Sequence, residues 1–243
     1  MTGGTLAALA LPERAALLLD LDGTLLDIAP TPAAVRVPEE LPATLRRLRA
    51  RLDDALAIVS GRPAEQVDAL LPGIAYAVAG EHGGAMRFAP GAAVARAPLP
   101  PVPPAWLSEA EALIAAHPGT LLEHKARGFV LHYRLAPAAG PALERGLLAL
   151  LDGQATHVLM PAHMAFEVKP RGADKGSAVA ALLDRAPFAG RVPVYIGDDV
   201  TDEDAIRVAR ARGGLGLRVA EAFGDAAGVR AWLWRLASAE VAA

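Results

Sequence analysis

Short apolar runs that stop at a polar residue or a glycine constrain the fold of this chain more than any other feature. Four such runs and the residues that follow them are 16–19 and Asp20, 56–59 and Ser60, 75–79 and Gly80, and 192–196 and Gly197. A near-continuous apolar composition is typical of strands that are buried on both faces, as in parallel sheets. A further apolar stretch at 215–219 predicts another strand of the same kind.

Helical patterns lie between these runs. They cover residues 39–52, 64–71, 175–185, 201–212 and 228–238. The alternation of strands and helices favours an α/β fold with a doubly wound parallel sheet. In such sheets ligands bind beyond the carboxyl ends of the strands, so we expect Asp20, Ser60 and Asp198 to share one crevice.

The middle of the chain departs from this alternation. Residues 98–104 contain five prolines and predict an extended linker. The elements expected beyond it are a helix at 105–116, strands at 120–125 and 128–135, a helix at 139–151, and strands at 155–160 and 164–169. We therefore predict a core domain made of residues 1–102 and 169–243, with an inserted α+β cap domain at 103–168. We expect the cap to cover the crevice; the alternative is a subdomain that does not touch it.

Composition excludes several classes of protein. The chain has 243 residues, no cysteine and a formal net charge of −3. Disulfides and thiolate sites are therefore excluded, and the charge does not favour nucleic acid or an anionic membrane as a partner. No apolar run approaches the ~20 residues of a membrane span, and no basic leader precedes the first apolar patch. We expect a cytoplasmic protein without an obligate protein partner.

Two acidic segments carry the strongest chemical signal. Asp20 and Asp22 follow a buried strand and precede Gly23, while Asp198 follows the strand at 192–196. Burying carboxylates at the end of a sheet costs several kcal/mol unless a cation or hydrogen bonds compensate the charge. Two carboxylates from different strands, together with water and a phosphate, suit Mg²⁺. The acids at 202–204 have a simpler explanation as well, because acidic side chains stabilise a helix N-terminus.

Two further residues point to an anionic ligand. Lys175 stands at the expected start of a helix, where a cation opposes the helix dipole unless a phosphate lies nearby. Ser60 lies at the end of a strand and offers a hydroxyl and neighbouring amides for the same purpose. A turn serine without any such function is an equally good explanation of Ser60 taken alone.

Taken in order along the chain, these motifs resemble those of the haloacid dehalogenase superfamily phosphatases, and within it the trehalose 6-phosphate phosphatase family. The resemblance covers nearly the whole chain. The segments that carry it are Asp20–Thr24, Val59–Arg62, Gly80–Gly83, Leu122–Lys125, His132–Arg134, Glu167–Pro170, Lys175–Gly176 and Gly197–Glu203.

The resemblance implies a role for each site residue. Asp20 would be the nucleophile that forms an aspartyl-phosphate, and Asp22 the general acid and base. Mg²⁺ would be held by Asp20, by the backbone carbonyl of Asp22 and by Asp198. The remaining implied contacts are Thr24, Ser60 and Lys175 to the phosphate, and Asp199 and Asp202 to waters around the metal.

The resemblance also implies a small-molecule substrate, trehalose 6-phosphate. Its sugar would be recognised by Glu123, Lys125 and Glu167 of the cap, with His82 lining the pocket floor. The alternative for Glu123 and Lys125 is a cross-strand ion pair at the surface, and for His82 a buried structural histidine.

Three rival functions remain open. One is a sister phosphatase that acts on sucrose 6-phosphate or mannosyl-3-phosphoglycerate. Another is a receiver-type signalling domain, although the Asp20-x-Asp22 spacing supplies an acid for a leaving group that a receiver does not need. The third is a sensor of the sugar phosphate without catalytic activity. Every acidic residue of the motifs is present, so nothing in the sequence supports a loss of activity.

Overall fold

The computed structural model describes residues 10–31, 34–74, 76–125 and 127–239. The chain divides into two compact units. Unit 1 consists of the chain up to Ala97 and from Asp174 onward, and unit 2 is the inserted segment Pro98–Ala173. The junctions lie five residues from the predicted boundaries at 102/103 and 168/169.

Unit 1 is built on a seven-stranded sheet with the order β11-β10-β1-β2-β3-β4-β5. Its strands are β1 (Ala15–Leu19), β2 (Leu56–Val59), β3 (Ala77–Gly80), β4 (Ala85–Arg87), β5 (Ala95–Arg96), β10 (Val192–Gly197) and β11 (Leu215–Arg218). All pairs from β11 to β3 are parallel, whereas β4 and β5 add antiparallel strands at one edge. The predicted α/β fold with a doubly wound, mostly parallel core sheet is confirmed.

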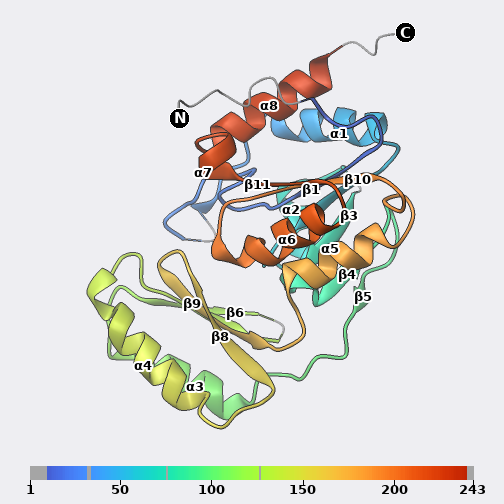
Figure 1. The fold of residues 1–243 in the computed structure, drawn as a ribbon. Helices are drawn as coiled ribbons and strands as arrows, with labels where there is room; N and C mark the ends of the chain where they lie inside the picture. The colour runs from blue at the N-terminus through green and yellow to red at the C-terminus, as the bar shows by residue number, and fades with distance from the viewer. Residues whose placement is uncertain (1–9, 32–33, 75, 126, 240–243) are drawn as a thin grey trace. The chain divides into compact units, whose positions relative to one another are not determined.

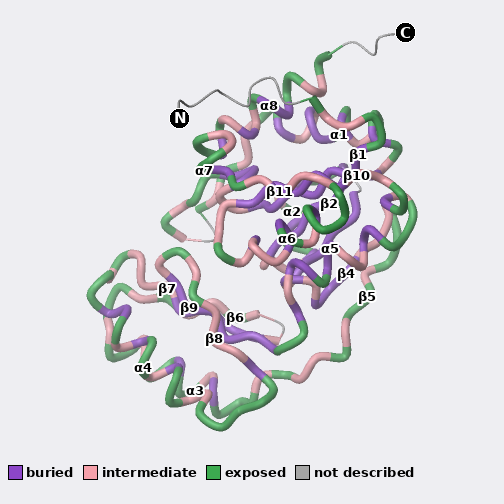
Figure 2. Tube along the Cα trace, viewed as in Figure 1, coloured by how far each residue is buried: buried purple, intermediate pink, exposed green. Residues whose placement is uncertain are grey.

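Helices cover this sheet on both faces (Figure 1). The helices of unit 1 are α1 (Leu41–Arg51), α2 (Ala64–Leu70), α5 (Lys175–Leu183), α6 (Glu203–Ala211), α7 (Val219–Ala222) and α8 (Ala226–Ser238). Helices α1 and α8 pack together along one side of the sheet, and α5 and α6 pack together along the other. The central strands are therefore enclosed, and β1 and β2 are buried at every residue (Figure 2).

The strand order determines where unit 1 has a ligand crevice. The chain proceeds from β1 through β2 to β3 on one side of β1, and later places β10 and β11 on the other side. Ligands of open α/β sheets bind at such a reversal, beyond the carboxyl ends of the strands. Here the reversal lies between β1 and β10, the strands that lead into Asp20 and Asp198.

Unit 2 is an α+β unit with its own core. Its four-stranded antiparallel sheet has the order β6-β7-β9-β8, formed by β6 (Leu121–His124), β7 (Phe129–His132), β8 (His157–Ala162) and β9 (Ala165–Pro170). Helices α3 (Pro104–Ala115) and α4 (Gly140–Leu150) lie side by side against this sheet (Figure 1). Phe129, Leu143 and Phe166 are among the buried residues between the helices and the sheet.

Some short elements were not predicted from the sequence. These are β4, β5, α7 and the 3₁₀ turns η3 (Glu81–Gly83), η4 (Pro137–Ala139) and η5 (Val200–Asp202). Each has at most four residues, too few for an apolar period to be recognised. Among the described residues, no helix combines the length and the apolar character that a membrane crossing requires.

Candidate active site

Asp20 directly follows β1 and continues the pairing of this strand with β10. Its backbone N–H donates to the carbonyl of Ile196 in β10 (2.9 Å), and its side chain is buried. The following turn requires Gly23, which has a φ of +81°. A Cβ atom at Gly23 would lie 2.0 Å from Oδ2 of Asp198, so a larger residue would occupy the space of that carboxylate. Gly23 thus permits the two acidic segments to meet.

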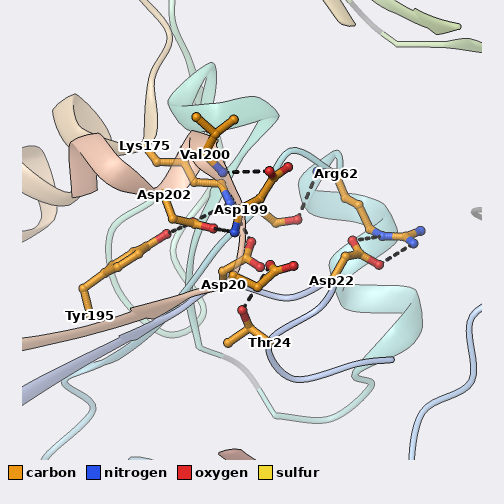
Figure 3. A network of polar contacts seen from close by, with 11 residues as sticks. Asp20, Asp22, Thr24, Arg62, Lys175, Tyr195, Asp199, Val200 and Asp202 are labelled. Atoms are coloured by element: carbon orange, nitrogen blue, oxygen red, sulfur yellow. Dashed lines mark hydrogen bonds and ion pairs between the residues drawn. The ribbon is translucent and has the colours of Figure 1, made fainter. Parts of the chain in front are cut away.

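Three carboxylates gather at this point of unit 1. One oxygen each from Asp20, Asp198 and Asp202 lie within 4.8 Å of one another, although Asp20 is far in sequence from the other two. Nζ of Lys175, the first residue of α5, donates to Oδ1 of Asp20 and Oδ1 of Asp202, both at 2.7 Å (Figure 3). The hydroxyl of Tyr195 also donates to Asp202. Apart from Asp198, which is partly exposed, these groups are buried.

Asp202, predicted only to orient waters around the metal, has its carboxylate fixed by several hydrogen bonds within the protein. The turn η5 begins with a capping box, in which the side chain of each aspartate, Asp199 and Asp202, accepts a hydrogen bond from the backbone N–H of the other. Oδ2 of Asp202 accepts the N–H of Asp199 (3.0 Å), and Oδ1 of Asp199 accepts the N–H of Val200 (2.7 Å). Stabilisation of a helix N-terminus, the simpler explanation of Asp202 from the sequence, is therefore incomplete, because Asp202 also accepts a hydrogen bond from Lys175.

The charges of this cluster do not balance. Three carboxylates face one ammonium group, and burial together with the carboxylates of Asp202 and Asp198 raises the pKa of Asp20 well above its usual value. Burial and the nearby Asp202 likewise raise the pKa of Asp198 to about 6. For Lys175, burial opposes the charge, but contacts with Asp20 and Asp202 outweigh it and raise the pKa.

A divalent cation fits this donor set. Hard cations such as Mg²⁺ take carboxylate oxygens, usually one or two from protein. The oxygens of Asp202 already accept from Lys175, Tyr195 and the N–H of Asp199. Asp198 accepts a long hydrogen bond from Thr24 (3.4 Å) and interacts with the side chain of Asp20. Asp20 and Asp198 are thus the better candidates for direct ligands, with Asp202 at their side.

The predicted general acid, Asp22, lies outside this cluster. Its carboxylate accepts two hydrogen bonds from the guanidinium of Arg62, from Nε at 2.6 Å and from NH2 at 2.7 Å (Figure 3). Ser60 stands two residues before Arg62 and is buried; its hydroxyl oxygen accepts the N–H of Arg62 (3.1 Å). Thr24, predicted to contact phosphate, is buried and donates to Asp198.

Arg62 and Tyr195 belong to the site, although no role was predicted for either of them. Arg62 is part of the Val59–Arg62 motif, and its position just beyond the end of β2 was the one available signal. Tyr195 lies inside the apolar run of β10 and is fully buried, so its hydroxyl needed a partner. A tyrosine in a strand with no other polar side chain is thus a usable signal of a nearby acceptor.

Of the predicted sugar-binding residues of the cap, Glu123 lies in β6 and Glu167 in β9 of the antiparallel sheet, and Lys125 directly follows β6. Nζ of Lys125 donates to Oε1 of Glu167 at 3.0 Å. Oε2 of Glu123 lies 2.7 Å from Nε2 of His132, across the β6–β7 pair. The Lys125–Glu167 ion pair is largely buried and the Glu123–His132 contact is partly buried, so neither is the exposed cross-strand pair considered as the alternative.

His82, the fourth residue predicted to bind the sugar, lies in unit 1 in the turn after β3. It is buried, with a relative exposure of 5%. Its imidazole packs directly against Gly61, because a Cβ atom at Gly61 would lie 2.7 Å from Nε2 of His82. In this position the ring supports the loop that follows β2.

Solved structures share this fold. The C-terminal domain of a trehalose-6-phosphate phosphatase from C. albicans superposes with a TM-score of 0.76 at 22% identity, covering 93% of this chain and 92% of that one. A haloacid dehalogenase-like hydrolase from Bacteroides thetaiotaomicron gives a TM-score of 0.57 at 16% identity, covering 81% and 86%.

Sequence comparison identifies the family. The family model described as trehalose-phosphatase matches residues 18–226. A trehalose-6-phosphate phosphatase of Escherichia coli is 36% identical over 231 residues, which cover 93% of this chain and 83% of that protein. A protein of Sinorhizobium fredii named "Probable trehalose-phosphate phosphatase" is 42% identical over 84% of this chain and 77% of its own length. The chain therefore belongs to the trehalose-phosphatase family, whose members are phosphoric monoester hydrolases with the haloacid dehalogenase-like fold.

Proposed function

We propose that this protein hydrolyses trehalose 6-phosphate to trehalose and phosphate with the help of Mg²⁺. The observation that carries the proposal is the buried Asp20, which contacts Lys175 at 2.7 Å and has Asp198 and Asp202 beside it. The choice of substrate is supported by the names of the E. coli and S. fredii relatives.

In the proposed reaction Asp20 attacks the phosphorus atom. A bond forms between a carboxylate oxygen of Asp20 and phosphorus, and the bond from phosphorus to the sugar oxygen breaks. Asp22 supplies the proton that this oxygen needs on departure. In the second step water attacks phosphorus and Asp22 accepts its proton, while the bond between phosphorus and the carboxylate oxygen of Asp20 breaks, which releases phosphate and regenerates Asp20.

The remaining residues stabilise charge. Lys175 would offset the negative charge of the phosphoryl oxygens, and the hydroxyl of Ser60 and backbone N–H groups of the 22–24 turn would donate hydrogen bonds to them. Mg²⁺ held by Asp20, Asp198 and the backbone carbonyl of Asp22 would supply further positive charge to the phosphoryl group. Asp199 and Asp202 would orient its waters.

The ion pair between Arg62 and Asp22 has a consequence for this scheme. Both oxygens of Asp22 accept from the guanidinium. The pair has to separate before Asp22 can give a proton to the sugar oxygen. A planar guanidinium matches a phosphate as well as it matches a carboxylate, so an arriving phosphate is a suitable exchange partner for Arg62.

Recognition of the sugar is proposed for Glu123, Lys125 and Glu167 of unit 2. A disaccharide presents hydroxyl groups and no charge beyond its phosphate. Charged side chains are suitable partners for it, because they form strong hydrogen bonds with hydroxyl groups. The pairing of Lys125 with Glu167 fixes both side chains in unit 2. Substitution of these residues is expected to raise KM for trehalose 6-phosphate without altering hydrolysis of p-nitrophenyl phosphate, which has no sugar.

The test of the proposal is release of phosphate by the purified protein with and without Mg²⁺. Trehalose 6-phosphate is expected to be hydrolysed faster than sucrose 6-phosphate or mannosyl-3-phosphoglycerate. Asp20→Asn removes the nucleophile and is expected to lower kcat by at least about 10³-fold. Asp152→Asn, at an exposed position of unit 2, is the matched control and should be fully active. Faster hydrolysis of another sugar phosphate would refute the proposed substrate, and full activity of Asp20→Asn would refute the mechanism.

A further inference from the structure

We propose that the turn Gly80–Gly83, and His82 in particular, positions the phosphate-binding groups of the site. This inference rests on the proposed phosphatase function but assigns His82 a different role from the sugar contact predicted from the sequence. The turn contacts the loop Ser60–Arg62 on one side and the start of α5, which carries Lys175, on the other. His82 is on this view a positioning residue that acts through Ser60, Arg62 and Lys175.

Backbone hydrogen bonds join the turn to the loop Ser60–Arg62. The N–H of Glu81 donates to the carbonyl of Arg62, and the N–H of His82 donates to the carbonyl of Ser60, both at 3.0 Å. The N–H of Ser60 in turn donates to the carbonyl of Ala79 at 2.8 Å. Three hydrogen bonds thus fix the backbone on both sides of Gly61.

The side chain of His82 fills the space beside Gly61. A Cβ atom built on Gly61 would lie 2.7 Å from Nε2 and 2.8 Å from Cε1 of the imidazole, closer than real Cβ contacts come. The backbone of Gly61 is outside the left-handed region, so the neighbouring ring is the reason that glycine is needed there. The contact between the imidazole of His82 and the backbone of Gly61 therefore determines where the loop Ser60–Arg62 lies.

The same turn also packs against the helix that carries Lys175. A Cβ atom at Gly83 would lie 2.8 Å from Cβ of Ala178 and 3.3 Å from the carbonyl oxygen of Asp174. Both residues belong to the first turns of α5 or to its N-cap. One four-residue turn therefore touches both segments that would hold the phosphoryl oxygens.

Two consecutive residues of the turn adopt left-handed backbone conformations that L-residues rarely take. Glu81 and His82 have φ values of +53° and +54°, and neither is a glycine. Consecutive left-handed residues cost free energy and persist where the surroundings determine them, which is common at functional sites. Glu81 is further anchored by an ion pair with Arg96 (2.8 Å). In this conformation the N–H groups of both residues donate to the loop Ser60–Arg62.

Two substrates separate positioning from contact with the sugar. His82→Ala is measured with trehalose 6-phosphate and with p-nitrophenyl phosphate, beside His163→Ala, an exposed histidine of unit 2, as the control. Since displacement of a catalytic group by about 1 Å can cost up to ~100-fold in rate, we expect kcat to fall about tenfold or more with both substrates and by a similar factor. A loss confined to trehalose 6-phosphate, or seen mainly in KM, would overturn the proposal in favour of a sugar contact.

A double-mutant cycle tests the contact itself. Gly61→Ala is expected to lower kcat about tenfold or more in the wild-type background, because the new methyl group pushes against the imidazole. In the His82→Ala background the same change should cost less than about threefold, since the space has been freed. Losses that simply multiply would show that Gly61 and His82 act independently and would overturn the inference.

Separate control measurements distinguish a loss of folding from a loss of function. Thermal unfolding of each variant shows whether it is folded at the assay temperature, and His82→Asn replaces His82→Ala if the latter is not, because asparagine tolerates the left-handed region. The inhibition constant of inorganic phosphate against p-nitrophenyl phosphate gives a readout that sugar recognition does not affect, and we expect it to rise in His82→Ala. An inactive wild-type protein would refute the proposed function, whereas an active wild type with an unaffected His82→Ala would refute only this inference.

Discussion

Lys175 is the residue on which the electrostatics of the site depend. It is 4% exposed and is the ammonium partner of both Asp20 and Asp202. Removing one partner of a buried ion pair leaves uncompensated charge, which typically costs about 3–5 kcal/mol. Lys175→Met is therefore expected to lower the free energy of unfolding by that amount at pH 8, measured by urea denaturation.

The loss in Lys175→Met should depend on pH in a defined direction. Without the ammonium, the folded state holds protons on its buried carboxylates more tightly than the unfolded state does, so stability falls as pH rises. The difference from wild type should be larger at pH 8 than at pH 5. Arg212→Met breaks an exposed pair with Asp184 and serves as the control, with at most about 1 kcal/mol lost at either pH. A loss in Lys175→Met that did not vary with pH would contradict this account.

Residues of the site could be predicted from the sequence where the strand pattern placed them. Asp20, Ser60 and Asp198 each follow an apolar run, and this position alone predicts the edge of the sheet. The partner of Asp22 could not be predicted in the same way. Arg62 reaches Asp22 across 40 positions of sequence, and the packing of His82 on Gly61 requires two turns to approach each other. Such contacts depend on side-chain geometry that no local pattern encodes.

Among the elements, α5 shows most clearly how a local signal serves the site. Its N-cap is Asp174, whose Oδ1 accepts the N–H of Ser177 at 2.7 Å. An N-cap contributes about 1 kcal/mol relative to alanine, and asparagine or serine can replace aspartate there. We expect Asp174→Ala to lower the free energy of unfolding by about 1 kcal/mol and Asp174→Asn to leave it within a few tenths of wild type. Equal losses in the two variants, measured by urea denaturation, would show that the charge and not the cap is responsible.

Elements were predictable in proportion to their length and burial. The strands β1, β2 and β10 have four to six residues that are almost all buried, and they produced the apolar runs that located them. By contrast, β5 has two residues, both exposed, and lies at the edge of the sheet. Its antiparallel pairing with β4 arises from the tertiary structure, which outweighs weak local preference.

At the scale of the whole molecule, the stability of each unit should respond to a different solution condition: unit 1 to divalent cations and unit 2 to pH. Unit 1 holds the acidic cluster of Asp20, Asp198 and Asp202, so a divalent cation should stabilise it. Unit 2 holds His157, which is 2% exposed and packs edge-on against Trp106 with 5.1 Å between ring centroids. Burial lowers the pKa of His157, so protonation of its imidazole should destabilise unit 2.

These two responses can be read out separately by hydrogen exchange with mass spectrometry. A divalent cation at 100 times its Kd stabilises the state that binds it by about 2.7 kcal/mol, so the slowest amides of unit 1 should exchange about 100-fold more slowly in Mg²⁺. Asp198→Asn should reduce this protection, since it removes one of the proposed ligands.

Acid should act on unit 2 through His157. The unfolded state binds a proton with a pKa of about 6.5 and the folded state with a lower one, so stability is complete above that pH and is lost below it. Between pH 7.5 and 5.5 the slowest amides of unit 2, corrected for intrinsic exchange, should therefore open up to about tenfold more often. In His157→Gln this increase should disappear, because glutamine does not titrate. Persistence of the increase in His157→Gln would assign it to another group, and an equal response of both units to acid would show that they unfold together.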